Sequence, residues 1–289
     1  MSIRLCAGMA AMGCSVVVAA GQSGFPYCQV IDGSDAPAWS AQVSYTAPAD
    51  VQTDAGRSIA FWAVRGGGGL YYRDTKSGAV SLGGSYEVLI SDGNGGVAIP
   101  DILAALRLEA GWTLRWWDGR ALQLLWRPGL YSDTEDWSSK DFFSPFEVNG
   151  VQAINSQLSC VLGLALYPGF ERTFDPRFGF RYAPADSMRI DLMYPETRLT
   201  YRPADWEIAL GVRHDAVREY RLEKEDPRRL MAIRETRVYL AGAWPIGDLL
   251  RMTAEVGQAL NREIDFDRVE TVLDIDDTWY VQFGVGGML

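Results

Sequence analysis

The amino-acid sequence predicts an all-β chain that folds into a transmembrane antiparallel up-and-down β-barrel of about twelve strands. Three observations predict this class. Apolar residues alternate with small or polar ones over most of the chain, short and long connections alternate along it, and aromatic residues recur at corresponding strand ends. After residue 20 no stretch approaches the roughly eighteen consecutive apolar residues of a spanning helix, so a membrane form must use strands.

The N-terminus is typical of an export signal. Arg4 precedes an apolar run that ends at Ala20, and cleavage after Ala20 leaves small residues where signal peptidase requires them. A lipoprotein signal at Cys14 has too little apolar chain before the cysteine, and an uncleaved anchor is at the short end for a spanning helix. We therefore predict a signal peptide at 1–20, a flexible periplasmic lead at 21–38 and a β-barrel domain at 39–289.

The four cysteines divide at the predicted cleavage site. Cleavage removes Cys6 and Cys14 and leaves Cys28 and Cys160. An exported pair of cysteines can form a disulfide. Cys160, however, stands among leucines on an apolar strand face, which favours a small buried hydrophobe. Pairing of Cys28 with Cys160 therefore stays open.

Twelve runs of the sequence have the two-residue period of strands. In the clearest run Leu106 and Leu108 share one face and Arg107 lies on the other. The second run is the weakest because Gly66–Gly69 interrupts it, and the eighth changes phase at Pro195, which indicates either a bulge or two short strands. The predicted strands are residues 39–48, 57–73, 79–91, 101–117, 120–131, 153–167, 171–183, 187–202, 206–222, 231–244, 248–262 and 278–288.

The connections between these runs alternate in length. Short ones follow even-numbered strands, at 74–78, 118–119, 168–170, 203–205 and 245–247. Those after odd-numbered strands are 49–56, 92–100, 132–152, 184–186, 223–230 and 263–277, and all but 184–186 are longer. Outer-membrane barrels combine short periplasmic turns with long outer loops, so both termini are predicted on the periplasmic side.

Aromatic residues agree with this topology. We expect a periplasmic girdle, where interfacial rings belong, formed by Trp39, Trp116, Tyr201, Trp206 and Trp244. A secreted soluble β-sandwich or small barrel has the same period and is the structural alternative. The loop asymmetry and the aromatic girdle favour the membrane barrel.

Two stretches carry a family resemblance: residues 174–182, and residues 191–203 with the run Pro-Glu-Thr-Arg-Leu-Thr-Tyr-Arg-Pro. They resemble an uncharacterised bacterial outer-membrane β-barrel family, one of the domains of unknown function. The resemblance implies a barrel in the cell outer membrane and brings no activity or catalytic residues. The last strand also resembles the signal that barrel-assembly machinery reads, although Gly287 and Leu289 depart from it.

Charge is segregated between the two strand faces. If the apolar face is outward, arginines outnumber acids on the inward face, while the surplus acid lies in the predicted outer loops. We predict a pore whose lumen offers anionic solutes these arginines: Arg107, Arg115, Arg177, Arg181, Arg189, Arg198, Arg202, Arg213, Arg237 and Arg251. The alternative is a non-conducting barrel filled by Arg–Glu pairs that acts through its acidic outer loops. Twelve strands lie between filled and open barrels, so both stay open.

Other activities find little support. The net charge of −10 argues against a nucleic-acid partner. The single histidine, His214, shares a face with Trp206 and has no serine at a suggestive spacing, so we predict no enzyme. Asp274, Asp276 and Asp277 lack the glycine and terminal glutamate of a calcium loop, so no metal or cofactor is predicted. The expected partners are outer-membrane lipid, lipopolysaccharide, barrel-assembly machinery and small anionic solutes.

Overall fold

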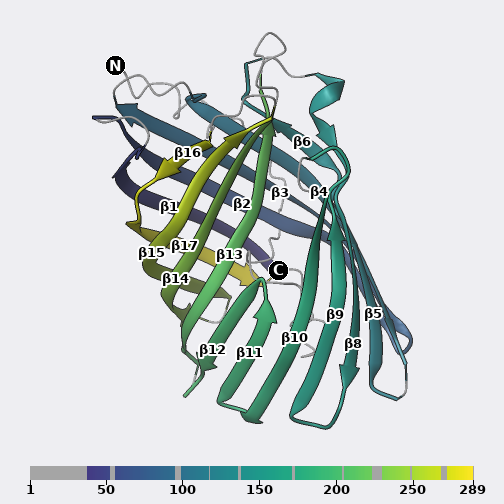
Figure 1. Cartoon of the computed structure of the whole chain (residues 1–289). Coiled ribbons are helices and arrows are strands. Elements are labelled where there is room, and N and C mark those ends of the chain that lie inside the picture. The colour runs from purple at the N-terminus through teal and green to yellow at the C-terminus, as the bar shows by residue number, and fades with distance from the viewer. Residues whose placement is uncertain are drawn as a thin grey trace.

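The computed structural model describes ten segments of the chain, and these are almost entirely β-strand (Figure 1). The described residues are 38–52, 56–94, 99–116, 118–135, 138–170, 173–203, 205–222, 230–247, 249–267 and 272–288. The predicted signal peptide, nearly all of the predicted lead, and Cys28 lie outside them. Within these segments no helix is long and apolar enough to cross a bilayer.

Fourteen strands form one closed antiparallel ring. In ring order they are β1 (Ala38–Asp50), β2 (Ser58–Thr75), β3 (Gly78–Asn94), β4 (Ile102–Arg115), β5 (Arg120–Trp126), β8 (Phe146–Ala153), β9 (Leu158–Leu166), β10 (Phe174–Ala185), β11 (Met188–Tyr194), β12 (Glu196–Tyr201), β13 (Glu207–Arg221), β14 (Leu230–Ile246), β15 (Leu250–Phe266) and β17 (Thr278–Met288). β1 pairs with both β2 and β17, which closes the barrel. Ala38 pairs with Met288, so the first and last strands meet at one end.

The predicted count of twelve strands was therefore wrong by two. Residues 132–152, predicted as an outer loop, include β8, and residues 187–202, predicted as one strand, are β11 and β12. The outward face of β8 includes Gly150 and Gln152, so its apolar alternation is too weak to indicate a strand. The phase change at Pro195 marks a reversal of the chain rather than a bulge, because β11 and β12 pair with each other.

We call the barrel end with the Asp118–Gly119 hairpin the turn end, and the opposite end the loop end. The two missed strands change the side of two connections: 168–170 lies at the loop end and 184–186 at the turn end, opposite to the prediction. Because two strands were added, every later strand keeps its predicted direction, and the turns at 203–205 and 245–247 lie at the turn end as predicted. In Figure 1 the turn end is at the bottom.

The outward face of the ring is apolar, as predicted. Leu106 and Leu108 are each more than half exposed, and a soluble barrel would bury such a face. The predicted girdle residues Trp116, Tyr201, Trp206 and Trp244 are exposed near the turn end. A second aromatic group nearer the loop end joins Tyr45 to Trp62 and Trp279, with ring centroids 4.5 and 6.0 Å apart. An apolar band between two aromatic girdles is the outer surface of a membrane barrel.

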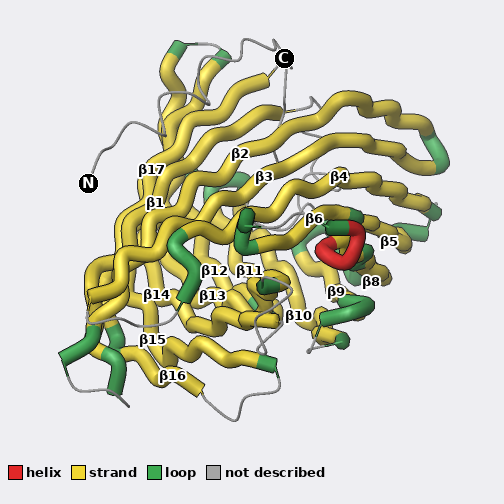
Figure 2. Tube along the Cα trace, turned by 90° about the horizontal axis from the view of Figure 1, so that it is seen from above, coloured by secondary structure: helices red, strands yellow, loops and turns green. Residues whose placement is uncertain are grey.

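The barrel narrows at its loop end into a smaller closed ring of nine strand segments. Two short strands belong to this ring, β6 (Gly129–Ser132) and β16 (Val272–Ile275). The 3-10 helix η1 (Ser139–Asp141) is red in Figure 2. It is followed by the short strand β7 (Phe142–Phe143), which pairs with β6. The order around this ring is β13, β14, β15, β16, β1, β2, β3, β4 and β6. It closes where Ser132 of β6 meets Arg221 of β13 in a parallel bridge. We call this contact the β6–β13 seam.

Candidate functional site

The lumen below the small ring is lined by arginines held in ion pairs. All ten arginines predicted from the sequence are paired with an acid, in the pairs Arg107–Glu87, Arg115–Asp74, Arg177–Glu147, Arg181–Asp191, Arg189–Asp191, Arg198–Glu207, Arg202–Glu207, Arg251–Glu207, Arg213–Glu255 and Arg237–Glu235. Strand parity therefore identified the inward face correctly. A role of these residues in binding solute stays a prediction.

Arginines outnumber the carboxylates that hold them. Five carboxylates hold eleven arginines: Glu87 holds Arg65 and Arg107, Glu147 holds Arg127 and Arg177, Asp191 holds Arg181 and Arg189, Glu235 holds Arg237 and Arg262, and Glu207 holds Arg198, Arg202 and Arg251. Together with Arg213 and with the further inward acids Glu109, Asp175, Glu196, Glu219 and Glu255, these pairs make twelve arginines and ten acids. The lumen thus has a positive surplus, although the whole chain is acidic.

Burial of the arginines increases from the turn end inward. Arg202 and Arg251 are 45% and 42% exposed, so their side chains at the turn end contact solvent, and we call this end of the lumen the vestibule. Arg237, deeper in the lumen, is 2% exposed; it pairs with Glu235 at 2.6 Å and its guanidinium carbon lies 4.5 Å from the centre of the Tyr280 ring. A guanidinium tolerates such burial because it can stack on an aromatic face while its N–H groups meet a carboxylate.

Tyrosines join the inward arginines and their acid partners, a set of residues that we call the arginine band. Tyr239 donates a hydrogen bond to Glu196, and Arg213 lies 5.2 Å from the centre of its ring. Tyr280 donates to Glu255 at 2.7 Å. The band is thus a connected network, and removing one member leaves its neighbours with unmet hydrogen bonds in a region of low dielectric constant.

The interior of the small ring is apolar. We call the buried residues that fill it the loop-end core: Ala49, Val51, Ile59, Phe61, Ala63, Leu89, Leu103, Ala105, Tyr131, Phe143, Phe170, Tyr220, Leu222, Leu230, Met231, Ile233, Ile264, Phe266 and Ile275. Phe143 and Phe170 stack with centroids 4.4 Å apart, and the Tyr131 ring meets both edge-on. A ring of about eight strands has an interior that side chains just fill, which accounts for this packing.

Beside this core, Tyr167 of the 167–173 connection contacts Phe170 with ring centroids 5.9 Å apart. Burial is the main cause that raises the pKa of the Tyr167 phenol above its ordinary value, and the nearby Arg177 opposes the rise. The ring therefore stays protonated and neutral at the edge of the apolar core.

The β6–β13 seam is short compared with the full ladders elsewhere. The backbone N–H of Asp133 donates to the carbonyl of Arg221 at 3.1 Å. The Arg221 side chain approaches Asp141 at 4.0 Å, and its guanidinium carbon lies 5.5 Å from the centre of the Phe143 ring. Few contacts therefore close the small ring at this point.

Two cavities within the described lumen are too small for a solute. One of about 50 Å³ lies in the arginine band beside Arg198, Arg213 and Glu255. Another of about 10 Å³ lies between Phe61, Ile233 and Arg237, where the loop-end core meets the arginines. A water molecule needs roughly 10–15 Å³, so the first holds a few waters and the second at most one.

Several lumen residues were missed in the sequence. Arg65 lies in the run weakened by glycines, Glu147 in the predicted outer loop, and Glu196 directly after Pro195. Arg262 follows Asn261, whose positive φ of 48° accompanies a register shift that turns the next residues inward. The first three lie where apolar alternation is weak or interrupted, and Arg262 follows a register shift that alternation alone does not reveal.

Other candidates lie away from the lumen. His214 is on the outward face, as predicted, with Nδ1 3.0 Å from the Thr236 hydroxyl. Cys160 shares that face and pairs with Phe180. Of the acids weighed for calcium, Asp276 accepts from Gln52 and Asp277 from the backbone of Asn261. The described segments hold no group of three or more metal-ligating side chains.

Residues 72–272, most of the barrel, match the family described as Domain of unknown function (DUF6268). The chain belongs to this family. The match confirms the resemblance to an uncharacterised outer-membrane barrel family. No curated protein matches this DUF6268 chain.

Solved structures show the fold. The COG4313 outer membrane channel from Pseudomonas putida F1 is 9% identical, with a TM-score of 0.51 over 88% of this chain and 96% of that one. The KdgM porin is 11% identical, with a TM-score of 0.39 over 86% and 99% of the chains. The translocator domain of the autotransporter NalP from Neisseria meningitidis is 12% identical, with a TM-score of 0.43 over 91% and 93%. The first likeness shows that the DUF6268 barrel has the architecture of an outer-membrane channel.

Proposed function

We propose that this DUF6268 barrel is a gated channel of the outer membrane for small anionic solutes, closed in this structure at the β6–β13 seam. One observation carries the proposal: an arginine-lined interior that contacts solvent at the turn end leads to a small ring that a single short contact closes. The fold shared with an outer-membrane channel supports the membrane location and the channel class.

The orientation follows from the connections. Short turns face the periplasm and longer loops face outward in outer-membrane barrels, so the turn end is periplasmic and the small ring is outside. A solute at the vestibule meets Arg202 and Arg251, and deeper sites offer Arg198 and Arg213. Fixed guanidinium groups attract carboxylates, phosphates and sulfates and repel cations, which favours anions.

Closure at the small ring combines a weak seam with an apolar core. Opening requires β6 to leave β13, which breaks the Asp133–Arg221 hydrogen bond and withdraws Tyr131 and Phe143 from the loop-end core. Exposing these rings to water costs free energy, so the closed form is favoured at rest. An apolar constriction also resists ions by excluding water.

Planar-bilayer recording under a KCl gradient tests the proposal. The purified, folded barrel is expected to show rare openings with a reversal potential that favours chloride. Replacing two vestibule arginines, Arg202→Gln and Arg251→Gln, is expected to reduce that preference without changing how often the channel opens. Openings that favour potassium, or an unchanged reversal potential in the double variant, would contradict the anion assignment.

A second candidate is a non-conducting barrel that serves as a structural or surface-interaction element. The observation in its favour is that every predicted lumen arginine already has an acid partner. Such pairs can fill a lumen permanently. This candidate predicts silence under all voltages from a protein that has inserted correctly.

A further inference from the structure

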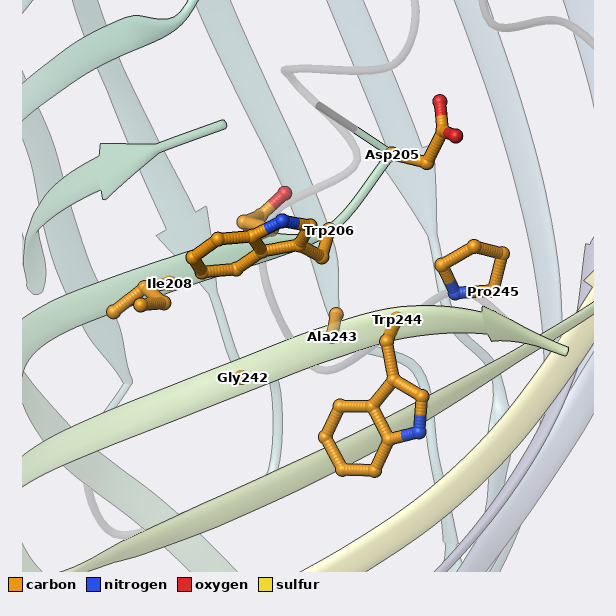
Figure 3. Close-up of a pocket in the computed structure, with 8 residues that line it drawn as sticks. Asp205, Trp206, Ile208, Gly242, Ala243, Trp244 and Pro245 are labelled. Carbon is orange, nitrogen blue, oxygen red and sulfur yellow. The ribbon is translucent and has the colours of Figure 1, made fainter. Parts of the chain in front are cut away.

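A groove lies on the outer surface of the barrel at the turn end, between β13 and β14 (Figure 3). Its volume is about 590 Å³, and it is an open groove rather than an enclosed cavity. The groove is lined by Asp205, Trp206, Glu207, Ile208, Gly242, Ala243, Trp244 and Pro245. Figure 3 shows the two indole rings on neighbouring segments, with Gly242 and Ala243 on the strand between them.

A missing side chain creates the groove. Gly242 pairs with Ile208, so it occupies an outward position of β14 in a row of large apolar neighbours. A Cβ at Gly242 would come no closer than 3.6 Å to the Trp244 ring and 3.9 Å to the Glu207 carbonyl, which are ordinary contacts. The fold therefore admits a methyl group here without a clash, and glycine leaves that space beside the Trp244 ring empty.

The groove lies in the turn-end aromatic girdle, at the boundary between hydrocarbon and water. Trp206, Ile208 and Trp244 are exposed on its walls, so its apolar surface faces lipid. Two acids line the groove: Glu207 is buried and paired with lumen arginines, while Asp205 is exposed at the rim on the water side. This rim attracts a cation and repels an anion.

We propose that this groove binds one phospholipid with an ethanolamine headgroup, with an acyl chain between Trp206 and Trp244 and the headgroup ammonium beside Asp205. The proposal rests on the barrel spanning the membrane and not on its being a channel. Charge complementarity selects the headgroup, because the described residues that line the groove include the exposed Asp205 carboxylate and no arginine or lysine to meet an anionic glycerol headgroup. The apolar walls and the interfacial depth select the chain.

Native mass spectrometry of the full folded barrel in detergent tests this site. Phosphatidylethanolamine and phosphatidylglycerol with identical chains are titrated separately into wild type, Gly242→Leu, Asp205→Asn and the matched control Gly150→Leu. Gly150 is also an outward glycine with room for a side chain, since its Cβ would lie 3.6 Å from the Leu162 carbonyl, but β8 is on another part of the wall. Heat-modifiable gel migration confirms that each variant is folded.

Wild type and Gly150→Leu are expected to retain one phosphatidylethanolamine, with a preference over phosphatidylglycerol of about two- to fivefold, the factor that an exposed ion pair supplies. Gly242→Leu is expected to bind about tenfold more weakly, because leucine displaces roughly two methylene groups of the chain. Asp205→Asn should keep the lipid and lose the preference. Equal retention by Gly242→Leu and Gly150→Leu would overturn the site, and an unchanged preference in Asp205→Asn would overturn the headgroup assignment.

Discussion

The Glu207 carboxylate pairs with three arginines in the lumen, so Glu207→Gln tests whether the arginine band stabilises the barrel. Its carboxylate accepts hydrogen bonds from Arg198 at 2.6 Å, Arg202 at 2.7 Å and Arg251 at 3.2 Å, while its own side chain is 8% exposed. Glutamine keeps the shape and removes the charge, so the variant isolates the electrostatic contribution.

The magnitude follows from the exposure of the three partners. Breaking a fully buried pair costs about 3–5 kcal/mol, and breaking an exposed pair about 0–1 kcal/mol. Arg198 is 22% exposed and lies between these limits, while Arg202 and Arg251 are at the exposed limit because water and salt screen them. We expect Glu207→Gln to lower the free energy of unfolding by about 3 kcal/mol, most of it from Arg198.

Urea unfolding in lipid vesicles, followed by tryptophan fluorescence, measures this change. Glu109→Gln is the matched control, because this inward glutamate accepts a hydrogen bond from the Ser85 hydroxyl at 2.7 Å, and the substitution should cost about 1 kcal/mol. A Glu207→Gln barrel as stable as Glu109→Gln would refute the reasoning. It would mean that the three arginines are already satisfied by water.

Three further predictions concern other parts of the barrel. A Cβ at Gly211 would lie within 2.5–2.9 Å of the Tyr239 ring, so Gly211→Ala should lower the free energy of unfolding by about 1–3 kcal/mol in urea titrations; an unchanged midpoint would show that the ring moves freely. In a cysteine-free background on whole cells, an impermeant maleimide should label Thr173→Cys at the loop end and not Asp186→Cys at the turn end, and the reverse pattern would restore the twelve-strand topology. Leu89 is 2% exposed in the loop-end core, so Leu89→Ala should lower the free energy of unfolding by about 2–5 kcal/mol and raise the frequency of channel openings. An equal opening frequency would show that the loop-end core is not part of the gate.

The strands and the arginine face could be predicted because both depend on parity. Once Leu106 and Leu108 face lipid, Arg107 must face the lumen, whatever its partners are. The partners themselves depend on register and sequence separation: Arg213 meets Glu255 across 42 residues, and no local pattern indicates that pair. The face of the sheet on which each arginine lies could therefore be predicted, and its ion-pair partner could not.

The closure of the small ring could not be predicted for a similar reason. β6 has four residues, and it meets β13 through Ser132 and Arg221, which are far apart in the sequence. The loop-end core is inward and apolar where the lumen lower down is inward and polar, so the inward face changes chemistry along its length. Alternation treats both halves alike, which is why the apolar loop-end core could not be predicted.

The measurement that tests the gate most directly is single-channel recording of a Ser132→Cys, Arg221→Cys double variant. These residues are partners across the β6–β13 seam, and neighbouring strands lie about 4.8 Å apart, within the Cα span of about 4.4–6.8 Å that a disulfide bridges. The account predicts silence when the disulfide is formed and anion-selective openings after reduction, with both single variants active in either state. Openings of equal frequency before and after reduction would contradict a gate at this seam, and silence in every state from correctly inserted protein would establish the non-conducting barrel instead.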